Sequence, residues 1–367
     1  MLQSTFRNWA PELMKKTLVL KVDPENPQVD VIRTAADIIK QGGLVAFPTE
    51  TVYGLGADAL NPNAVKALFK AKRRPPDNPP IVHVGDPRDV YKLAREVPEK
   101  AEQLIRRFWP GPLTLILKRA EIVPDVTVSG LDTIAIRMPK HNVALALIRE
   151  SGCPIAAPSA NLAGRPSPTT AQHVLEDLNG RIDAILDAGP TKIGVESTVL
   201  DLTVDPPQIL RPGGTPYEAL KEVLGRVELH PVAVADRKMH VDKARSPGMK
   251  HRHYAPKAKM VVVEGNLQAV VEKVAELVEF YRLRKEKVGV LATDETASLY
   301  GADVVKSLGS RSRMEEIAKN LFRLLRELDA EGVDIIIAEG VPTEGLGLAV
   351  MNRLRKASGY RIVKVGS

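Results

Sequence analysis

The sequence predicts an α/β protein with two domains. The larger, N-terminal domain is expected to be a twisted, open, mixed sheet with flanking helices, and the smaller C-terminal domain a Rossmann-like α/β unit. Three observations predict the two-domain α/β organisation: a length of 367 residues, short apolar runs that alternate with helical patterns, and a change of composition after about residue 225. Residues 226–259 carry few apolar pairs and many cations, histidines and prolines, which indicates a functional loop or linker.

Strand-like and helix-like patterns follow one another through the N-terminal domain. Caps and breakers set most of the boundaries, such as Asn61-Pro62 at a helix start and Gly42-Gly43 at a helix end. In order, we expect an edge strand at 17–22, a helix at 29–41, a strand at 44–47, a helix from 62, a strand at 81–84, a helix near 87–107, a strand after WPGP at 109–112, a strand at 133–139, a helix at 142–151, a strand at 154–157, a helix after Thr169-Thr170, and a hairpin of 194–203 with 208–214.

The stretch KRRPPDNPPIVH, residues 72–83, is a basic and proline-rich turn between an expected helix and an expected strand. Lys72 lies seven residues after Val65, so it extends the apolar stripe of that helix. A lysine at such a position either snorkels to solvent or meets an anion. Ile81 and His83 then share one face of a short strand. The pattern favours a polyphosphate site, and a solvated basic helix end is the alternative.

Hydroxyl side chains follow the strand at 44–47, in the run PTETVYGLGAD. In an extended conformation Thr49, Thr51 and Tyr53 point to the same side. Three hydroxyls at a strand end suggest a small polar ligand, and the alternative is that they only cap the strand.

Arg137 interrupts the apolar strand TIAIRMP, where it shares a face with Thr133. A cation in such a strand costs several kcal/mol unless it is paired. It therefore requires a carboxylate or a phosphate, and a buried Asp or Glu is the alternative to a ligand. Arg211 is a second cation in an apolar context, in the strand QILR.

Small and hydroxyl residues mark a further candidate surface. Ser159 and Asn161 leave the small-residue strand PIAA on one face, where a ligand could approach the backbone closely. Thr169 precedes a helix start, at which an anion could also sit. Ser197 is presented by the first strand of the expected hairpin.

From residue 260 onward a regular βα alternation predicts a mostly parallel sheet. The region contains no GxGxxG or P-loop pattern, so we interpret it as an accessory or regulatory unit. The expected elements are strands at 260–264, 288–293, 303–308, 333–339 and 360–365, with helices at 267–286, 312–331 and 345–358.

Composition narrows the functional classes. The net charge of +7 is compatible with an anionic partner without demanding one. The single cysteine, Cys153, cannot form an internal disulfide and fits a reducing cytoplasm, without structural zinc. No signal-peptide core and no apolar run of membrane-spanning length are visible, so we expect no membrane association. Aromatic residues are only 4%, which argues against a platform for single-stranded nucleic acid.

Taken together, the motifs resemble those of a known family. Residues 1–225 look like the YrdC-like catalytic domain of threonylcarbamoyl-AMP synthases, and residues from about 240 resemble the linker and C-terminal domain of the long, two-domain form. We therefore expect a linker or lid at 226–259 and an accessory α/β domain at 260–367. The motifs that carry the resemblance are PTETVYGLG, Lys72-x-Arg74 followed by Asn78 and His83, WPGPLT, the Arg137 strand, Ser159-x-Asn161, EST at 196–198, LRPG and PGMKxxHYAP.

The resemblance implies an ATP-dependent nucleotidyltransferase. L-threonine, bicarbonate and ATP, with magnesium on the ATP phosphates, would give threonylcarbamoyl-adenylate and pyrophosphate. The product would be handed to the transferase machinery that modifies adenosine in tRNAs reading codons that begin with A; contact with tRNA itself is compatible but not required. No metal held by the protein's own side chains is expected.

The resemblance also assigns residues. Arg137, helped by Ser197, would hold the threonine carboxylate, and Tyr254 would close over the nucleotide. The implied threonine-binding residues are Thr51, His83, Arg137, Ser159 and Ser197, the implied ATP-binding residues are Lys72, Arg74, Asn78, Thr133, Asn161, Thr169, Arg211 and Tyr254, and the implied catalytic pair is Lys72 with Arg74.

No nucleophilic side chain is needed for this chemistry, which rests on alignment and on neutralisation of charge. Two alternatives remain at this point. One is a carbamoyl-adenylate-forming enzyme like the related domain of hydrogenase-maturation carbamoyltransferases, although the zinc-finger and acylphosphatase modules of those proteins are missing from this sequence. The other is a binding module for double-stranded RNA or tRNA, which would act through phosphate contacts.

Overall fold

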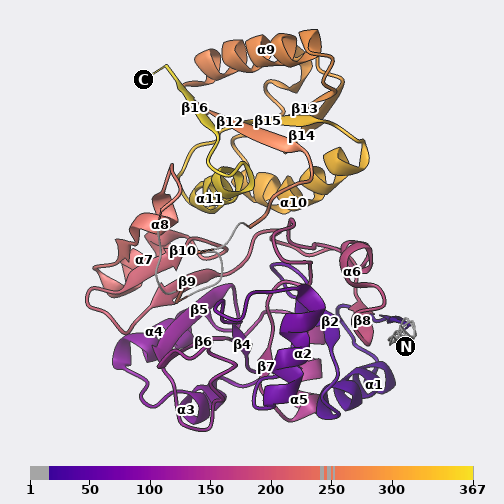
Figure 1. The fold of residues 1–367 in the computed structure, drawn as a ribbon. Coiled ribbons are helices and arrows are strands. Elements are labelled where there is room, and N and C mark those ends of the chain that lie inside the picture. Colours follow the sequence, from indigo (N-terminus) through magenta and orange to yellow (C-terminus); the bar gives the residue numbers. More distant parts are fainter. Residues whose placement is uncertain (1–15, 240–243, 246–248, 251–252, 367) are drawn as a thin grey trace, which may run out of the picture.

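A computed structural model describes residues 16–239, 244–245, 249–250 and 253–366 (Figure 1). The PGMKxxHYAP motif therefore lies partly outside the described residues. Within them, the strands form two sheets, one of eleven strands and one of five. The predicted mixed α/β architecture is confirmed, and the last strand of the large sheet and the first strand of the small one are separated by residues 230–258.

The large sheet combines parallel and antiparallel pairs in the order β1-β8-β2-β3-β7-β4-β6-β5-β9-β10-β11. Strand β1, which the sequence predicts as an edge strand, lies at one end of this order. The strands are β1 (Leu18–Lys21), β2 (Val45–Phe47), β3 (Gly54–Asp58), β4 (Val82–His83), β5 (Leu113–Lys118), β6 (Thr133–Arg137), β7 (Ile155–Ala156), β8 (Ala184–Asp187), β9 (Thr198–Asp201), β10 (Gln208–Arg211) and β11 (Glu228–Leu229).

Helices cover this sheet, and most start where the sequence predicts. Asn61 caps α2 by accepting hydrogen bonds from the amides of residues 63 and 64. The single helix expected near 87–107 is wrong, because Pro98 starts a new helix and the chain is extended before it. The helices are α1 (Val29–Lys40), α2 (Pro62–Lys72), α3 (Val90–Leu93), α4 (Glu99–Phe108), α5 (Asn142–Ser151), α6 (Ala171–Leu178), α7 (Tyr217–Leu224) and α8 (Pro231–Val234).

Residues 48–53 form a tight turn and not the extended segment that the sequence analysis assumed. The Thr49 hydroxyl donates to the Val52 carbonyl at 2.7 Å and accepts from the Thr51 and Val52 amides. Such local side-chain bonds compete with a strand. Thr49 and Thr51 consequently face one cavity, whereas the Tyr53 hydroxyl donates to the Gly189 carbonyl at 2.7 Å and its ring lies in the core.

The small sheet is parallel throughout, in the order β14-β13-β15-β12-β16, which confirms the Rossmann-like prediction. Figure 1 shows α9 on one face of this sheet, and α10 and α11 on the face toward the N-terminal domain. The elements are β12 (Lys259–Gly265), α9 (Leu267–Leu283), β13 (Val288–Ala292), β14 (Val304–Ser307), α10 (Met314–Ala330), β15 (Ile335–Glu339), α11 (Gly347–Ala357) and β16 (Ile362–Val365).

Helices α10 and α11 pack directly against the N-terminal domain. A Cβ atom at Gly194 would lie 2.4 Å from the backbone of α10, so only glycine fits there. Two buried ion pairs cross the interface, Arg326 with Asp177 at 3.0 Å and Arg353 with Glu196 at 2.8 Å. No helix in the described part of the chain is long and apolar enough to cross a membrane.

Candidate active site

A small cavity of about 50 Å³ lies where the turn after β2, strands β4, β6 and β10 and residues 253–254 meet. Eight residues that the sequence analysis assigned to the site line this cavity: Thr51, Arg74, His83, Arg137, Ser159, Ser197, Arg211 and Tyr254. They come from segments as far apart in sequence as residues 51 and 254, and the fold gathers them around one hollow. The other five assigned residues, Lys72, Asn78, Thr133, Asn161 and Thr169, do not line it.

The register of β6 with its neighbours β4 and β5 places Arg137 in the cavity wall. The parallel pairing of β4 with β6 sets it beside His83. Its guanidinium is 3% exposed and forms an ion pair of 2.7 Å with the buried Glu50. A second nitrogen donates to the Thr51 hydroxyl at 3.1 Å, and Nε donates to the Gly111 carbonyl at 3.2 Å. The buried carboxylate that the sequence analysis kept as an alternative is therefore present.

His83 is a neutral member of the site. Burial, and next the nearby Arg137 charge, lower the pKa of the His83 imidazole to about 3. Nδ1 lies 3.2 Å from the Ile81 carbonyl, to which it donates. The other ring nitrogen is then an acceptor that could take a hydrogen bond from a hydroxyl or an ammonium group of a ligand.

Ser197 and Arg211 form the side of the cavity next to β5. The Arg211 guanidinium donates twice to the Ser197 carbonyl, at 2.9 and 3.2 Å, and once to its hydroxyl at 3.2 Å. The Ser197 hydroxyl also lies 2.8 Å from that of Thr114. These contacts orient the guanidinium without neutralising it, and burial lowers the pKa of Arg211.

Arg74 is the second cavity arginine that has no ion pair with a carboxylate among the residues that the structure describes. It is 8% exposed, and it donates to the Asn78 carbonyl at 2.8 Å and the Pro79 carbonyl at 3.1 Å. Burial, followed by the Arg211 charge, lowers the pKa of Arg74 to about 9, so it remains protonated at neutral pH. Two buried like charges that repel each other form an environment that favours an anion.

Lys72 lies behind the cavity wall. Its side chain is buried, and its ammonium donates to the carbonyls of Ser159 and Asn161. Burial, and then the Arg74 charge, hold the pKa of Lys72 well below its usual value. The Lys72 carbonyl in turn accepts the amide of Ala163 at 2.9 Å. Lys72 therefore fixes the loop that carries Ser159 and Asn161.

Two amide side chains near the cavity have buried oxygens without a hydrogen-bond partner. They are Oδ1 of Asn78 and Oδ1 of Asn161, whose residues are 2% and 5% exposed. Unpaired buried acceptors are costly, and each could accept a hydrogen bond from a bound ligand. Thr133 at the start of β6 and Thr169 beside His173 are buried as well, at greater remove from the cavity.

Tyr254 closes the cavity from the linker side. It is 4% exposed, adopts a left-handed φ of 63°, and stacks on Phe322 of α10 with 5.3 Å between ring centroids. The guanidinium carbon of Arg353 lies 5.3 Å from the Tyr254 ring centroid. The C-terminal domain thus supports the residue that covers the site.

The sequence analysis missed three residues that shape the site. Glu50 holds Arg137, and Arg353 from α11 holds Glu196 beside Arg211. Glu196 also accepts the hydroxyl of Ser167 at 2.6 Å. Glu50 and Glu196 stand inside the quoted PTET and EST motifs, so an acidic residue next to a buried hydroxyl was a usable signal. Arg353 offered a second usable signal, because it is a charged residue on the apolar face of its helix, next to Leu354.

The arrangement is suited to binding an anion beside a small polar molecule. Two guanidiniums that have no ion pair with a carboxylate among the described residues line the same hollow as a paired arginine, a neutral imidazole and several hydroxyls. Among the described residues, no group of three or more His, Cys, Asp or Glu side chains could hold a metal ion.

Comparisons with known proteins agree over nearly the whole chain. A family model described as telomere recombination, which covers the Sua5, YciO and YrdC proteins, matches residues 37–213, and the model of the threonylcarbamoyl-AMP synthase C-terminal domain matches residues 215–359. The threonylcarbamoyl-AMP synthase of Pyrococcus abyssi is 56% identical over 91% of this chain and 96% of that protein. That of Bacillus subtilis is 51% identical over 91% of this chain and 94% of its own length.

A solved structure also matches this chain over nearly its whole length. The crystal structure of P. abyssi Sua5 complexed with L-threonine has a TM-score of 0.90 and 55% identity, and the match covers 95% of this chain and all of that one. These relatives support the synthase over the RNA-binding module and the carbamoyl-adenylate-forming enzyme. Site and comparisons agree: the chain belongs to the threonylcarbamoyl-AMP synthase family, in its two-domain form, and is an ATP-dependent enzyme of the adenylyl-transfer type.

Proposed function

We propose that the cavity joins L-threonine, bicarbonate and ATP into threonylcarbamoyl-adenylate, with release of pyrophosphate and water. The observation that carries this proposal is the division of the cavity. Arg137 with its hydroxyl neighbours lines one hollow together with Arg74 and Arg211, which have no ion pair with a carboxylate in the described part of the chain. The first group suits an amino acid and the second suits phosphates.

Threonine binds beside Arg137. The guanidinium takes the substrate carboxylate, Thr51 orients the guanidinium by accepting its hydrogen bond, and the Ser197 hydroxyl offers a further contact to the carboxylate. His83 and Ser159 accept from the ammonium or hydroxyl group. The P. abyssi relative was crystallised with L-threonine, which supports this substrate for a chain 55% identical to it.

ATP binds with its phosphates toward Arg74 and Arg211. Lys72 adds positive charge from behind the wall and positions Ser159 and Asn161. The unpaired oxygens of Asn78 and Asn161 accept from the nucleotide, and Thr133 and Thr169 contribute further contacts. Mg²⁺ arrives on the ATP phosphates, since Glu196, the acidic residue among those that line the cavity, is already held by Arg353 and Ser167.

The chemistry needs no nucleophilic side chain. The threonine amine attacks the carbon of bicarbonate and forms an N-carboxylate, with loss of water. An oxygen of that carboxylate attacks the α-phosphorus of ATP, and the bond to the bridging oxygen breaks as pyrophosphate leaves. The residues align the two substrates and stabilise the charge that develops on the phosphates.

Residues 226–259 serve as a linker that covers the site. The observed cavity of about 50 Å³ is too small for a nucleotide, and Tyr254 forms part of its wall. Tyr254 must therefore move away from Phe322 to admit ATP, and its return excludes water from the labile mixed anhydride. The domain at 260–367 supports this closed position.

The product is passed to the machinery that modifies adenosine in tRNAs reading codons that begin with A. A direct hand-over to a transferase, with or without contact to tRNA, would limit hydrolysis of the intermediate. The substrates and the free Cys153 fit an enzyme of the cytoplasm.

The test is a pyrophosphate-release assay with the full chain, supported by mass spectrometry of the adenylate. We expect release only when threonine, bicarbonate and ATP are all present, and a strong loss in a buffer depleted of carbon dioxide. Carbamoyl phosphate in place of bicarbonate serves as the matched control for the carbamoyl-adenylate reaction. Release that ignores threonine, or that requires carbamoyl phosphate, would overturn the proposal.

A further inference from the structure

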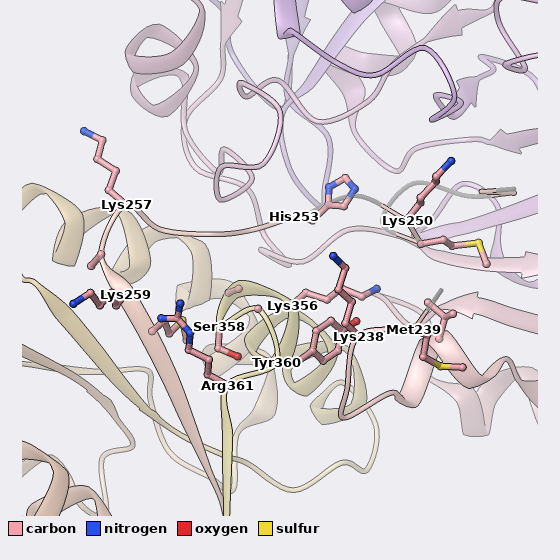
Figure 2. Close-up of a pocket in the computed structure, with 16 residues that line it drawn as sticks. Lys238, Met239, Lys250, His253, Lys257, Lys259, Lys356, Ser358, Tyr360 and Arg361 are labelled. Carbon is pink, nitrogen blue, oxygen red and sulfur yellow. The ribbon is translucent and has the colours of Figure 1, made fainter. Parts of the chain in front are cut away.

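A second and larger cavity, of about 490 Å³, lies between the linker and the C-terminal domain. Figure 2 shows Lys250 and His253 on its upper side and the end of α11 with the following turn on its lower side. It is distinct from the active-site cavity, with which it shares the lining residue His253. Its volume is in the usual range of small-molecule sites.

The described residues that line this cavity include many cations and no acid. The cationic ones are Lys238, Lys250, Lys257, Lys259, Lys356 and Arg361. Lys250 and Lys259 have carboxylate partners that lie outside the lining, at 2.8 and 3.7 Å respectively. These residues come from three separate segments of the chain, so they are not one basic run, and Figure 2 shows the Lys238 and Lys356 side chains reaching toward the hollow while Lys257 extends away from it.

Lys356 is the residue that distinguishes the cavity from an ordinary basic surface. It is 6% exposed, and among the described residues its ammonium has no hydrogen-bond partner. Burial, followed by the charges of Arg353 and Arg211, lowers the pKa of Lys356 to about 7. The other buried cations of the interface, Arg326 and Arg353, each have a carboxylate within 3.0 Å. An unpaired buried ammonium is costly, and a bound anion would remove that cost.

The chemistry of the lining selects the class of anion. Lysine ammonium groups are compact point charges with several donors, which suits phosphate oxygens more than a planar carboxylate pair. Several of them around one hollow favour a ligand with several negative charges. The phosphate backbone of an RNA duplex could meet the exposed lysines, but it is too broad to reach Lys356 inside the cavity.

We propose that this interdomain cavity is a second anion site, which binds the polyphosphate group of a small molecule separately from the active-site cavity. Inorganic pyrophosphate and the triphosphate of a nucleotide share this chemistry. Because His253 lines both cavities, an anion bound here contacts the segment that carries Tyr254. Occupancy of the two cavities is then coupled, and each ligand changes the affinity of the other by the same factor.

Isothermal titration of the full chain with inorganic pyrophosphate tests the proposal, and binding is read without turnover. We expect two sites per chain in the parent protein. Lys356→Met should remove the interdomain site or weaken it about tenfold or more, because a charge-assisted hydrogen bond is lost, and should leave the other site. Arg211→Met should remove the active-site binding and leave the interdomain site. Lys66→Gln, on an exposed face of α2, is the matched control for a lost surface charge.

Three further arms make the outcome decisive. A non-hydrolysable ATP analogue replaces pyrophosphate to distinguish the two sources of phosphate. An RNA duplex is added as a competitor, and binding of the duplex that depends on Lys356 would overturn the small-molecule assignment. If Lys356→Met does not fold, Lys238→Gln is titrated, since Lys238 is exposed and lines the cavity, and it should weaken the same site. A single pyrophosphate site in the parent, or unchanged binding in these variants, would overturn the proposal.

Discussion

The two ends of the active-site cavity handle buried positive charge differently. At one end, Arg137 is paired with the buried Glu50 at 2.7 Å. At the other, Arg74 and Arg211 donate to the backbone carbonyls of Asn78, Pro79 and Ser197 and have no carboxylate hydrogen-bonded to them. All three arginines are less than 9% exposed.

The paired arginine is therefore a fixed structural group, whereas the two arginines without an ion pair are available to bind an anion. A paired guanidinium is already stable, so it can hold its geometry whether or not a substrate is present. Guanidiniums held by carbonyls and a hydroxyl keep their charge available, and the anion that neutralises it has to come from the substrate. The paired end therefore defines where threonine lies, and the unpaired end supplies the electrostatic stabilisation of the phosphates.

The largest expected effect is at the unpaired end. We expect Arg74→Met or Arg211→Met to lower kcat/KM for pyrophosphate release by about 10- to 100-fold each, because a charge-assisted hydrogen bond of about 1.5–3 kcal/mol to the phosphates is lost. Steady-state assays at saturating threonine measure this. Arg88→Met, an exposed arginine paired with Asp86, is the control and should be neutral. Rates within twofold of the parent would show that these charges do not face the phosphates.

At the paired arginine, we expect a substitution to affect mainly the stability of the protein. Glu50→Gln leaves Arg137 buried and uncompensated, and we expect the free energy of unfolding to fall by about 3 kcal/mol. Denaturant unfolding measures this change, and added threonine should restore more stability to the variant than to the parent. Glu150→Gln, in the exposed pair with Arg33, should change stability little. An equally small change for Glu50→Gln would remove the distinction between the two ends.

A substitution of Lys72 tests whether phosphate binding depends on the loop that Lys72 holds in place. Lys72→Met leaves the carbonyls of Ser159 and Asn161 without their donor, and we expect a stability loss of about 2 kcal/mol. The KM for ATP should rise because the loop that carries Asn161 shifts. The measurements are unfolding and ATP-dependent kinetics on the same preparation. A loss of kcat at unchanged KM and stability would instead indicate that Lys72 contacts the phosphates in the transition state.

The smallest expected effect concerns the neutral imidazole beside Arg137. The folded pKa of His83, about 3, lies below its unfolded value near 6.5, so the unfolded state binds more protons between these values and stability falls as the pH drops through that window. From pH 7.5 to 5.5 this residue alone should cost about 1.4 kcal/mol. Unfolding of the parent and of His83→Gln at both pH values measures the difference. An unchanged pH dependence in the variant would show that the pKa of His83 in the folded protein is close to its unfolded value.

Much of the fold was predictable because local signals agreed with the tertiary structure. The helix expected at 142–151 is α5, which ends before Gly152, and the βα alternation after 260 is the parallel sheet. Local signals failed at 48–53, where a threonine turn replaces an extended segment, and at Pro98, which divides a helix. At 48–53 the hydrogen bonds of the Thr49 hydroxyl determine the local structure, and at position 98 the proline ring does. In both places these local effects outweigh the surrounding apolar pattern.

The sequence by itself determined the residue types of the site, its family and the kind of element that carries each residue, because caps, strand alternation and motif spacing are local properties. Only the tertiary structure decided which charges are paired. Glu50 with Arg137, Glu196 with Arg353, and Lys356 without a partner depend on how strands and domains pack, since an ion pair forms between atoms a few ångströms apart whatever their distance along the chain. That pairing decides where an incoming anion is stabilised.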